Sequence, residues 1–207
     1  MDIQTRKIDQ LTDREGPDES PVVSPDGKTI AYLGFDDKKQ GYQVDRLYTY
    51  DIATKKSTLV SSAFDNSLYG IEWSADGKGI YFLYDEKGNT KIGYITTTGK
   101  VSRKADNVGC TSLGRPYNSG SFSVASNGTL AYTYSTPSHP ADLGVMDSQA
   151  RFSRLTSLNN DIFQYKQIGK VEEIWYESSY DKKKIQGWII LPPDFDSSRK
   201  YPLLLEI

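Results

Sequence analysis

Short apolar runs rich in Val, Ile, Tyr and Thr recur along most of this chain, and clusters of Gly, Asp, Asn and Lys separate them. Runs of that length and composition are typical of β-strands, and the polar clusters between them are typical of tight turns. No segment of helical length repeats its apolar residues every three or four positions. The pattern therefore predicts a protein built almost entirely of β-strands.

The first complete group of runs predicts four strands, at about 21–23, 29–35, 46–51 and 57–60. The next group contains two further runs, 80–84 and 92–95, and the polar residues between them predict a hairpin turn. Each group is therefore interpreted as one small antiparallel sheet.

These groups are copies of one another. The nine residues 24–32, Ser-Pro-Asp-Gly-Lys-Thr-Ile-Ala-Tyr, reappear fifty positions later as Ser-Ala-Asp-Gly-Lys-Gly-Ile-Tyr-Phe, and a third copy with altered turn residues begins at Ser126. The lead-in Asp-Ile-Gln-Thr-Arg-Lys at 2–7 similarly matches 51–56. In the Asp-Gly pair, the Asp side chain caps a tight turn and the Gly adopts the positive φ that closes it.

Four strands recurring every 40–50 residues are typical of β-propeller blades, whereas solenoid repeats are usually shorter and carry one strand each. We therefore expect blades near 21–60, 70–105 and 121–156, preceded by the end of another blade that contains Asp2. A closed propeller needs about 4–8 blades. The expected fold class is thus all-β, with a partial β-propeller of four-stranded antiparallel blades whose N-terminal side is truncated.

The repeat stops after about residue 160, where a different pattern begins. Two strand-like runs, 171–178 and 185–191, flank a polar turn, and a Pro-Pro loop follows at Pro192. The final run, Tyr-Pro-Leu-Leu-Leu-Glu-Ile at 201–207, predicts a strand buried on both faces, as in the middle of an α/β sheet. We therefore expect two parts: a partial propeller at 1–165, then a linker and the first strands of a truncated domain at 166–207.

The order of these features resembles the prolyl oligopeptidase family of serine peptidases. The resemblance rests on propeller repeats followed by a strand hairpin, then Ile-Gln-Gly-Trp at 185–188, Pro-Pro-Asp-Phe at 192–195, and the segment 200–207. It is most specific over 171–207 and is closest to the acylaminoacyl-peptidase and bacterial dipeptidyl-peptidase-like branch. The resemblance identifies the terminal part as the start of an α/β-hydrolase domain.

Membership in that family implies that the propeller caps the hydrolase domain and admits only short or flexible peptides. It also implies a His-Gly-Gly-Pro oxyanion segment after 201–207, then a Gly-x-Ser-x-Gly nucleophile elbow, an Asp and a His. No Gly-x-Ser-x-Gly occurs in the 207 residues. We therefore expect the Ser-His-Asp triad to lie beyond residue 207, the chain itself to be an inactive fragment with no catalytic residue, and the parent to act on peptide substrates.

Composition narrows the possible partners. A net charge of −2 with no basic stripe argues against nucleic-acid binding. No apolar run approaches the roughly 20 residues of a membrane helix, and the polar start is unlike a signal peptide, which leaves a cytoplasmic or periplasmic location open. Cys110 excludes an internal disulfide or a cysteine-based zinc site, and with a single histidine we expect neither metal nor cofactor.

Few residues are candidates for chemistry. His139 is interpreted as an exposed loop histidine in the third blade rather than a general base. The pair Glu172-Glu173 cannot share a site, because neighbours on a strand face opposite ways. Arg115 and Tyr117, before the third blade, either clamp a peptide carboxylate or make a structural contact between blades.

Two other functions remain open from the sequence. Ser-Pro-Asp-Gly-Lys turns also occur in TolB-like propellers, which would make the chain a protein-interaction module without enzymatic activity. An esterase could use the same hydrolase scaffold, because fold does not fix substrate. The segment 171–207 discriminates against the interaction module, which has no evident use for an appended hairpin and a buried strand.

Overall fold

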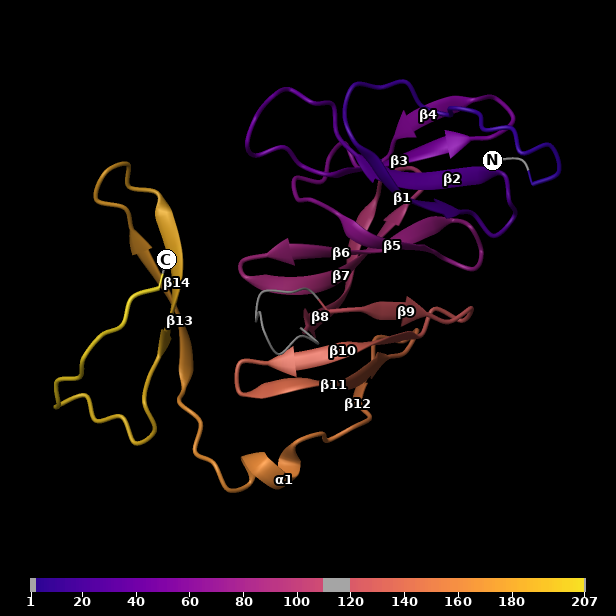
Figure 1. Cartoon of the computed structure of the whole chain (residues 1–207). Coiled ribbons are helices and arrows are strands. Elements are labelled where there is room, and N and C mark those ends of the chain that lie inside the picture. Colours follow the sequence, from indigo (N-terminus) through magenta and orange to yellow (C-terminus); the bar gives the residue numbers. More distant parts are fainter. Residues whose placement is uncertain (1–2, 110–119, 207) are drawn as a thin grey trace.

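A computed structural model of the chain describes residues 3–109 and 120–206, and it consists almost entirely of antiparallel strands (Figure 1). The first twelve strands in chain order are β1 (Asp18–Val23), β2 (Thr29–Gly34), β3 (Arg46–Asp51), β4 (Lys56–Leu59), β5 (Tyr69–Trp73), β6 (Gly79–Glu86), β7 (Asn89–Thr96), β8 (Val101–Val108), β9 (Phe122–Val124), β10 (Leu130–Thr136), β11 (His139–Met146) and β12 (Phe152–Arg154). A short helix, α1 (Asn160–Phe163), precedes β13 (Val171–Glu177) and β14 (Lys184–Ile190).

Three groups of four strands form propeller blades, as the repeat predicts. Strands β1–β4 pair in chain order to make the first blade, and β5–β8 make the second in the same way. The third blade contains β9–β12, and its β10 also pairs with β8 through Tyr134 and Val108. The second and third blades are therefore joined into one eight-stranded sheet, whereas the sequence pattern predicts separate sheets.

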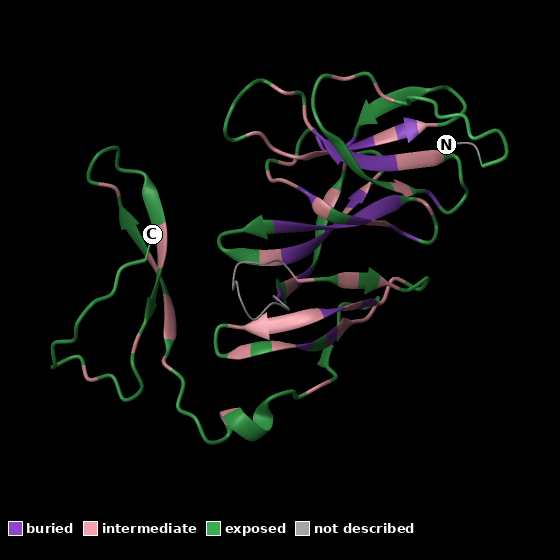
Figure 2. Cartoon of the chain, in the orientation of Figure 1, coloured by how far each residue is buried: buried purple, intermediate pink, exposed green. Residues whose placement is uncertain are grey.

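The main hydrophobic core lies between blades. One cluster joins the first blade to the second and includes Leu33, Leu47 and the fully buried Phe82. A second cluster joins the second blade to the third and includes Leu83 and Leu130. Neighbouring residues of β6 thus serve opposite faces of one sheet, and the second blade is covered on both sides (Figure 2).

The Asp-Gly turns have the predicted geometry. Gly27 and Gly77 have φ angles of 73° and 67°. In the first turn Asp26 Oδ1 accepts hydrogen bonds from Ser24 Oγ at 2.7 Å and from Lys28 N at 3.1 Å. The corresponding bonds to Asp76 in the second turn have the same two lengths. The two copies of the sequence repeat therefore form turns of the same local structure.

The turn of the lead-in repeat is also reproduced in the backbone, but the strands of the expected preceding blade are not: β3 and β4 flank the second copy, whereas no strand precedes Asp18 in the described residues. Residues 3–5 form a turn, as do residues 52–55, and Arg6 and Lys55, which occupy equivalent positions, have φ angles of 57° and 56°. Positive φ is uncommon outside glycine, so the shared angle marks a shared turn rather than a coincidence of composition.

The terminal part forms a separate two-stranded sheet. Strands β13 and β14 pair antiparallel from Val171–Ile190 to Glu177–Lys184, close to the predicted hairpin. The predicted buried strand at 201–207 is wrong for this chain: residues 201–206 carry no regular structure, and Leu203, Leu204 and Leu205 are 84%, 96% and 77% exposed. A strand becomes buried on both faces only when neighbouring strands and covering layers surround it, and nothing else in the described part of the chain does so.

Helix α1 was not expected from the sequence. It has four residues, and no helix within residues 3–109 and 120–206 is long and apolar enough to cross a membrane.

Candidate functional site

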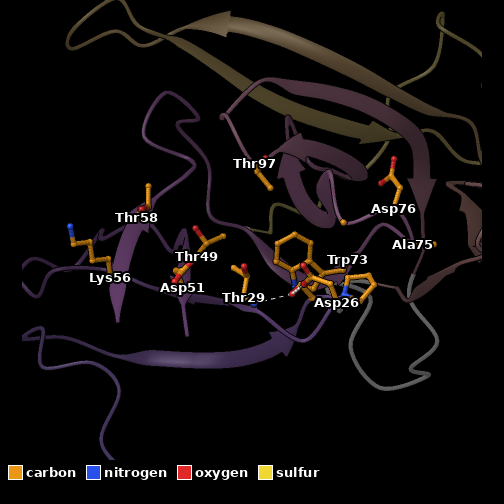
Figure 3. A pocket seen from close by; sticks show the side chains of 13 residues that line it. Asp26, Thr29, Thr49, Asp51, Lys56, Thr58, Trp73, Ala75, Asp76 and Thr97 are labelled. Atoms are coloured by element: carbon orange, nitrogen blue, oxygen red, sulfur yellow. Dashed lines mark hydrogen bonds between the residues drawn. The ribbon is translucent and has the colours of Figure 1, made fainter. Parts of the chain in front are cut away.

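A pocket with a volume of about 560 Å³ lies between the first and second blades. It is lined by the β1–β2 and β5–β6 turns, which carry the two Asp-Gly pairs, by residues of β2, β3, β4 and β5, and by the β7–β8 turn. Figure 3 shows side chains from these separate strands and turns around the pocket. They are mainly hydroxyl and carboxylate groups beside one indole and one lysine, and include Thr29, Thr49, Thr58, Thr97, Asp26, Asp51, Asp76, Trp73 and Lys56.

The pocket carboxylates are engaged in holding turns. The hydrogen bond from the Ser24 hydroxyl, followed by the one from Lys28 N, lowers the pKa of Asp26. The pKa of Asp76 is lowered in the same way, with the Ser74 hydroxyl as the largest cause. Both carboxylates are therefore ionised at neutral pH and each caps its own turn.

The pocket can bind a polar group, but its side chains lack the arrangement of a hydrolytic site. Ser24 Oγ donates to Asp26 and accepts from Thr29 N at 3.0 Å, so this hydroxyl closes a turn. An activated serine needs a base within hydrogen-bond reach that can remove its proton, normally a histidine. In the described ranges, no three His, Cys, Asp or Glu side chains gather as a metal site either.

The pocket and the terminal hairpin lie at opposite ends of the strands of the second blade. Strand β6 begins at the Asp-Gly turn that lines the pocket and ends at the β6–β7 turn, which contacts the hairpin through a hydrogen bond from Gln186 to the Lys87 carbonyl. Eight residues of strand separate the two turns, which is roughly 25 Å. The pocket-lining turn is therefore at the opposite end of β6 from the hairpin, which lies beside the β6–β7 turn (Figure 1).

A second polar site is found where the chain leaves the third blade. The Asp142 carboxylate, on β11, is fully buried, and its Oδ1 accepts hydrogen bonds from Thr156 Oγ1 and Leu158 N, both at 2.8 Å. Its Oδ2 forms an ion pair with Arg154 and lies 3.3 Å from His139 Nδ1. We call Asp142, Arg154, Thr156 and His139 the exit clamp, because together they fix the segment that leads to α1.

The prediction of an exposed loop histidine is wrong for His139. Its side chain is only 16% exposed, it begins β11, and its ring lies 5.2 Å from that of Phe163 in α1. Sequence reasoning assigned it to a loop because Ser138-His139-Pro140 is a turn-like stretch. Contacts with Asp142 and Arg154, which the local sequence does not reveal, hold the imidazole ring against Phe163 of α1.

The His139–Asp142 pair has two members of a hydrolytic triad but no third. His139 Nε2 is 2.9 Å from an Arg154 Nη2 and 3.3 Å from Asn160 Oδ1, whereas a triad would place a serine hydroxyl there. Among residues 3–109 and 120–206, the hydroxyl that bonds Asp142 is that of Thr156, which also accepts from Leu143 N at 2.9 Å. The arrangement fits a structural clamp.

The clamp also sets the charge of Asp142. Burial alone would raise the pKa of this carboxyl, but the hydrogen bonds from Leu158 N and Thr156, together with Arg154 and His139, lower it overall. The ionised form is therefore the one that the folded clamp stabilises.

The remaining candidates divide into two groups. Glu172 pairs with Lys170 at 2.7 Å, whereas Glu173 accepts from Trp175 Nε1 at 2.7 Å, so the two carboxylates face opposite ways as predicted. Arg115, Tyr117 and Cys110 lie outside the described residues, and their roles stay predictions.

Sequence reasoning missed the exit clamp. The available signal was Asp142, a carboxylate inside an otherwise uncharged strand run, since a buried Asp usually requires a partner. Arg154 is twelve residues away along the chain and gives no comparable signal.

Comparisons with known proteins place these features in context. No family model matches the chain. The dipeptidyl-peptidase 5 of Porphyromonas gingivalis is 34% identical over 194 residues, which cover 92% of this chain and 27% of that relative. The chain spans about a quarter of the length of the curated relatives that it matches.

Two solved structures show the same fold at low sequence identity. The Pyrococcus horikoshii acylaminoacyl peptidase aligns with a TM-score of 0.62 and 22% identity, covering 81% of this chain and 24% of that one. TolB from Acinetobacter baumannii aligns with a TM-score of 0.52 and 19% identity, covering 85% of this chain and 41% of that one. Both likenesses concern the blades and their arrangement rather than any activity.

Proposed function

We propose that this chain supplies propeller blades and the first strands of the hydrolase domain to a peptidase, because it belongs to the prolyl oligopeptidase family of serine peptidases. Residues 1–165 would form the propeller part, and 166–207 the linker and the entry to the catalytic domain. In this proposal the whole protein hydrolyses peptide bonds by acyl transfer to a serine.

The continuity of the alignment is the observation that supports the proposal most. The match to the dipeptidyl-peptidase covers 92% of the chain, so it must include residues on both sides of the blade–hairpin junction. A propeller shared only as a common repeat would be expected to match through its blades alone. The name of that relative makes release of dipeptides the first activity to assay.

The proposed role of the blades is to restrict access. The β6–β7 turn faces the hairpin, and the 560 Å³ pocket opens on the opposite face. In this role the face that carries the β6–β7 turn covers the catalytic domain, and only short or flexible peptides pass the propeller. The pocket would then lie on the outer face, away from the scissile bond.

The hydrolytic groups are proposed to belong to the catalytic domain outside these residues. The 207 residues contain no Gly-x-Ser-x-Gly elbow, and the single histidine is held in the exit clamp. The chain alone should therefore not bind serine-directed inhibitors and should not hydrolyse peptides.

Two measurements test the proposal. The isolated chain, treated with a fluorophosphonate and with dipeptidyl 4-nitroanilides, should show neither labelling nor turnover. A chimera in which it replaces the aligned segment of the Porphyromonas gingivalis relative should hydrolyse the dipeptidyl substrate and still reject a folded protein substrate. Labelling of a serine in the isolated chain, or a folded chimera without hydrolysis, would contradict the proposal.

A non-enzymatic interaction propeller is the second candidate function. The likeness of the blades to TolB favours it, although that likeness shows the fold alone. The alignment argues against it, because the match to a peptidase extends past the blades into the hairpin. Trp175, Tyr176 and Ile190 are 48%, 50% and 73% exposed there, and in the peptidase proposal the rest of the hydrolase domain would cover this apolar surface.

A further inference from the structure

The hairpin has two faces of different chemistry. Antiparallel pairing sets Glu173 opposite Trp188 and Trp175 opposite Gln186. These four residues alternate along their strands, so their side chains share one face of the sheet. The other face carries Glu172 near one end and otherwise the apolar side chains of Ile174, Tyr176, Ile185 and Ile189.

The polar-aromatic face is tied together by hydrogen bonds. Glu173 Oε1 accepts from Trp175 Nε1 and from Gln186 Nε2, both at 2.7 Å. Gln186 Nε2 also donates to the main-chain carbonyl of Lys87 at 3.0 Å, across 99 positions of sequence. The carboxylate thus orients both the amide that reaches the second blade and the indole beside it.

The partner of this face is the β6–β7 turn of the second blade. Lys87 and Gly88 have φ angles of 50° and 70°, the pair of positive values that a two-residue type I′ turn requires. The Lys87 ammonium lies 5.9 Å from the centre of the Trp175 ring, within cation–π range. The turn therefore offers a carbonyl and a cation to the hairpin.

Gly88 provides the closest part of the contact. A Cβ added to this glycine would lie 2.5 Å from Trp188 Cζ2, closer than packed atoms allow. The absence of a side chain at Gly88 is what lets the Trp188 ring rest on the turn. The same turn thus requires glycine twice, once for its φ angle and once for the approach of the indole.

We propose that the β6–β7 turn is a positioning surface that recognises the polar-aromatic face of the hairpin and sets where the hairpin lies against the blades. The covalent link from the third blade, residues 155–170, limits only how far the hairpin can travel. The contact with the second blade fixes its place. This inference concerns the contact itself, so it stands or falls independently of any peptidase activity.

The matched pair Gly88→Ala and Gly27→Ala tests the proposal. Gly27 has a φ angle of 73° in a similar exposed turn, and a Cβ there meets nothing within 4 Å, so the two variants share the backbone strain and differ in the clash with Trp188. Acrylamide quenching of tryptophan fluorescence in the 207-residue chain is the readout. Trp73 is buried between blades and contributes a constant background.

Gly88→Ala should raise the quenching constant toward that of the urea-unfolded chain, and Gly27→Ala should leave it at the wild-type value. Equal quenching in the two variants, with equal melting temperatures, would overturn the proposal.

A second variant covers the case in which Gly88→Ala disturbs the blade itself. Gln186→Leu removes the donor to Lys87 without altering the turn, and Lys184→Leu, two residues away on the same strand but paired with Glu177 rather than with the second blade, is its control. Quenching that rises in Gln186→Leu and not in Lys184→Leu supports the positioning surface. Quenching that stays at the wild-type value in Gln186→Leu overturns it, whatever Gly88→Ala does.

Discussion

The blades and the terminal hairpin use similar residues in opposite ways. In the blades, large apolar side chains such as Phe82 and Ile80 are completely buried between sheets. In the hairpin, Trp175 and Trp188 are both 48% exposed, although their strands are as regular as those of the blades (Figure 2). Backbone pairing alone therefore does not decide burial, which requires a second layer against the sheet.

The difference follows from the number of neighbours that each sheet has. The second blade lies between two others, so both of its faces are covered. The hairpin touches the second blade through its polar-aromatic face. On its other face Tyr176, Ile185 and Ile189 are 50%, 37% and 37% exposed. Under the proposed function, a hydrolase domain would supply that second layer.

The largest expected effect comes from removing a side chain between blades. Phe82→Ala would leave a cavity beside Phe64 and Tyr84, and we expect it to lower the free energy of unfolding by about 3–5 kcal/mol. Trp188→Ala, in the hairpin, should cost less than about 1 kcal/mol. Urea unfolding followed by circular dichroism gives both values, and similar losses in the two variants would erase the distinction between the regions.

A smaller effect is expected at the exit clamp, which connects the two regions. Asp142→Asn removes the charge that Arg154 faces, so the amides of residues 155–158 should lose protection against hydrogen exchange while the blade strands keep theirs. Asp147→Asn is the control, because Asp147 pairs with Arg151 in an exposed position. Equal protection of residues 155–158 in both variants would show that the exit clamp does not stabilise this segment.

The same clamp predicts a dependence on pH. Because the folded-state pKa of Asp142 lies below its unfolded value, its contribution to stability is complete above the ordinary Asp pKa of about 4 and is lost as the pH falls through the lowered folded pKa. Exchange of residues 155–158, measured from neutral to acid pH, should therefore accelerate in the acid range. Asp142→Asn should remove this acceleration, and its persistence in that variant would assign it to other carboxylates.

A slight gain is expected from restoring the repeat in the third blade. There Asn127 caps the turn at Thr129 N, and Ala125 stands where the first two turns have a serine. The double variant Ala125→Ser, Asn127→Asp should recreate the serine–aspartate bond and stabilise the chain by roughly 0.5 kcal/mol. Thermal melting decides this, and destabilisation would mean that the third turn has adapted to its own residues.

The smallest effect on stability is expected at the terminal segment. Replacing the exposed Leu204 and Leu205 with lysine should leave the melting temperature unchanged and reduce self-association, because these side chains contact solvent and not the core. Sedimentation velocity measures the association. A lowered melting temperature would show that the segment packs on the blades.

The fold was predictable where local chemistry determines it. The Asp-Gly turns at Gly27 and Gly77 require a capping carboxylate and a positive φ, and both are legible from neighbouring residues. The hairpin ranges were recovered within a residue or so for the same reason.

The parts that escaped prediction depend on residues distant in sequence. The pairing of Tyr134 with Val108, which merges two blades, depends on how whole sheets pack and leaves no local signature. The clamp at Asp142 and the approach of Trp188 to Gly88 are likewise tertiary contacts. The prediction of a buried strand at 201–207 was wrong because an apolar run becomes a buried strand only when other strands pair with it and cover it.

Hydrogen exchange resolved along the whole chain tests most directly the claim that the blades carry their own core whereas the terminal part depends on a further layer. Amides of β2, β3, β6 and β7 should be strongly protected, those of β13 and β14 weakly, and residues 203–206 should exchange as in an unstructured peptide. Protection of residues 203–206 equal to that of β6 would contradict the claim.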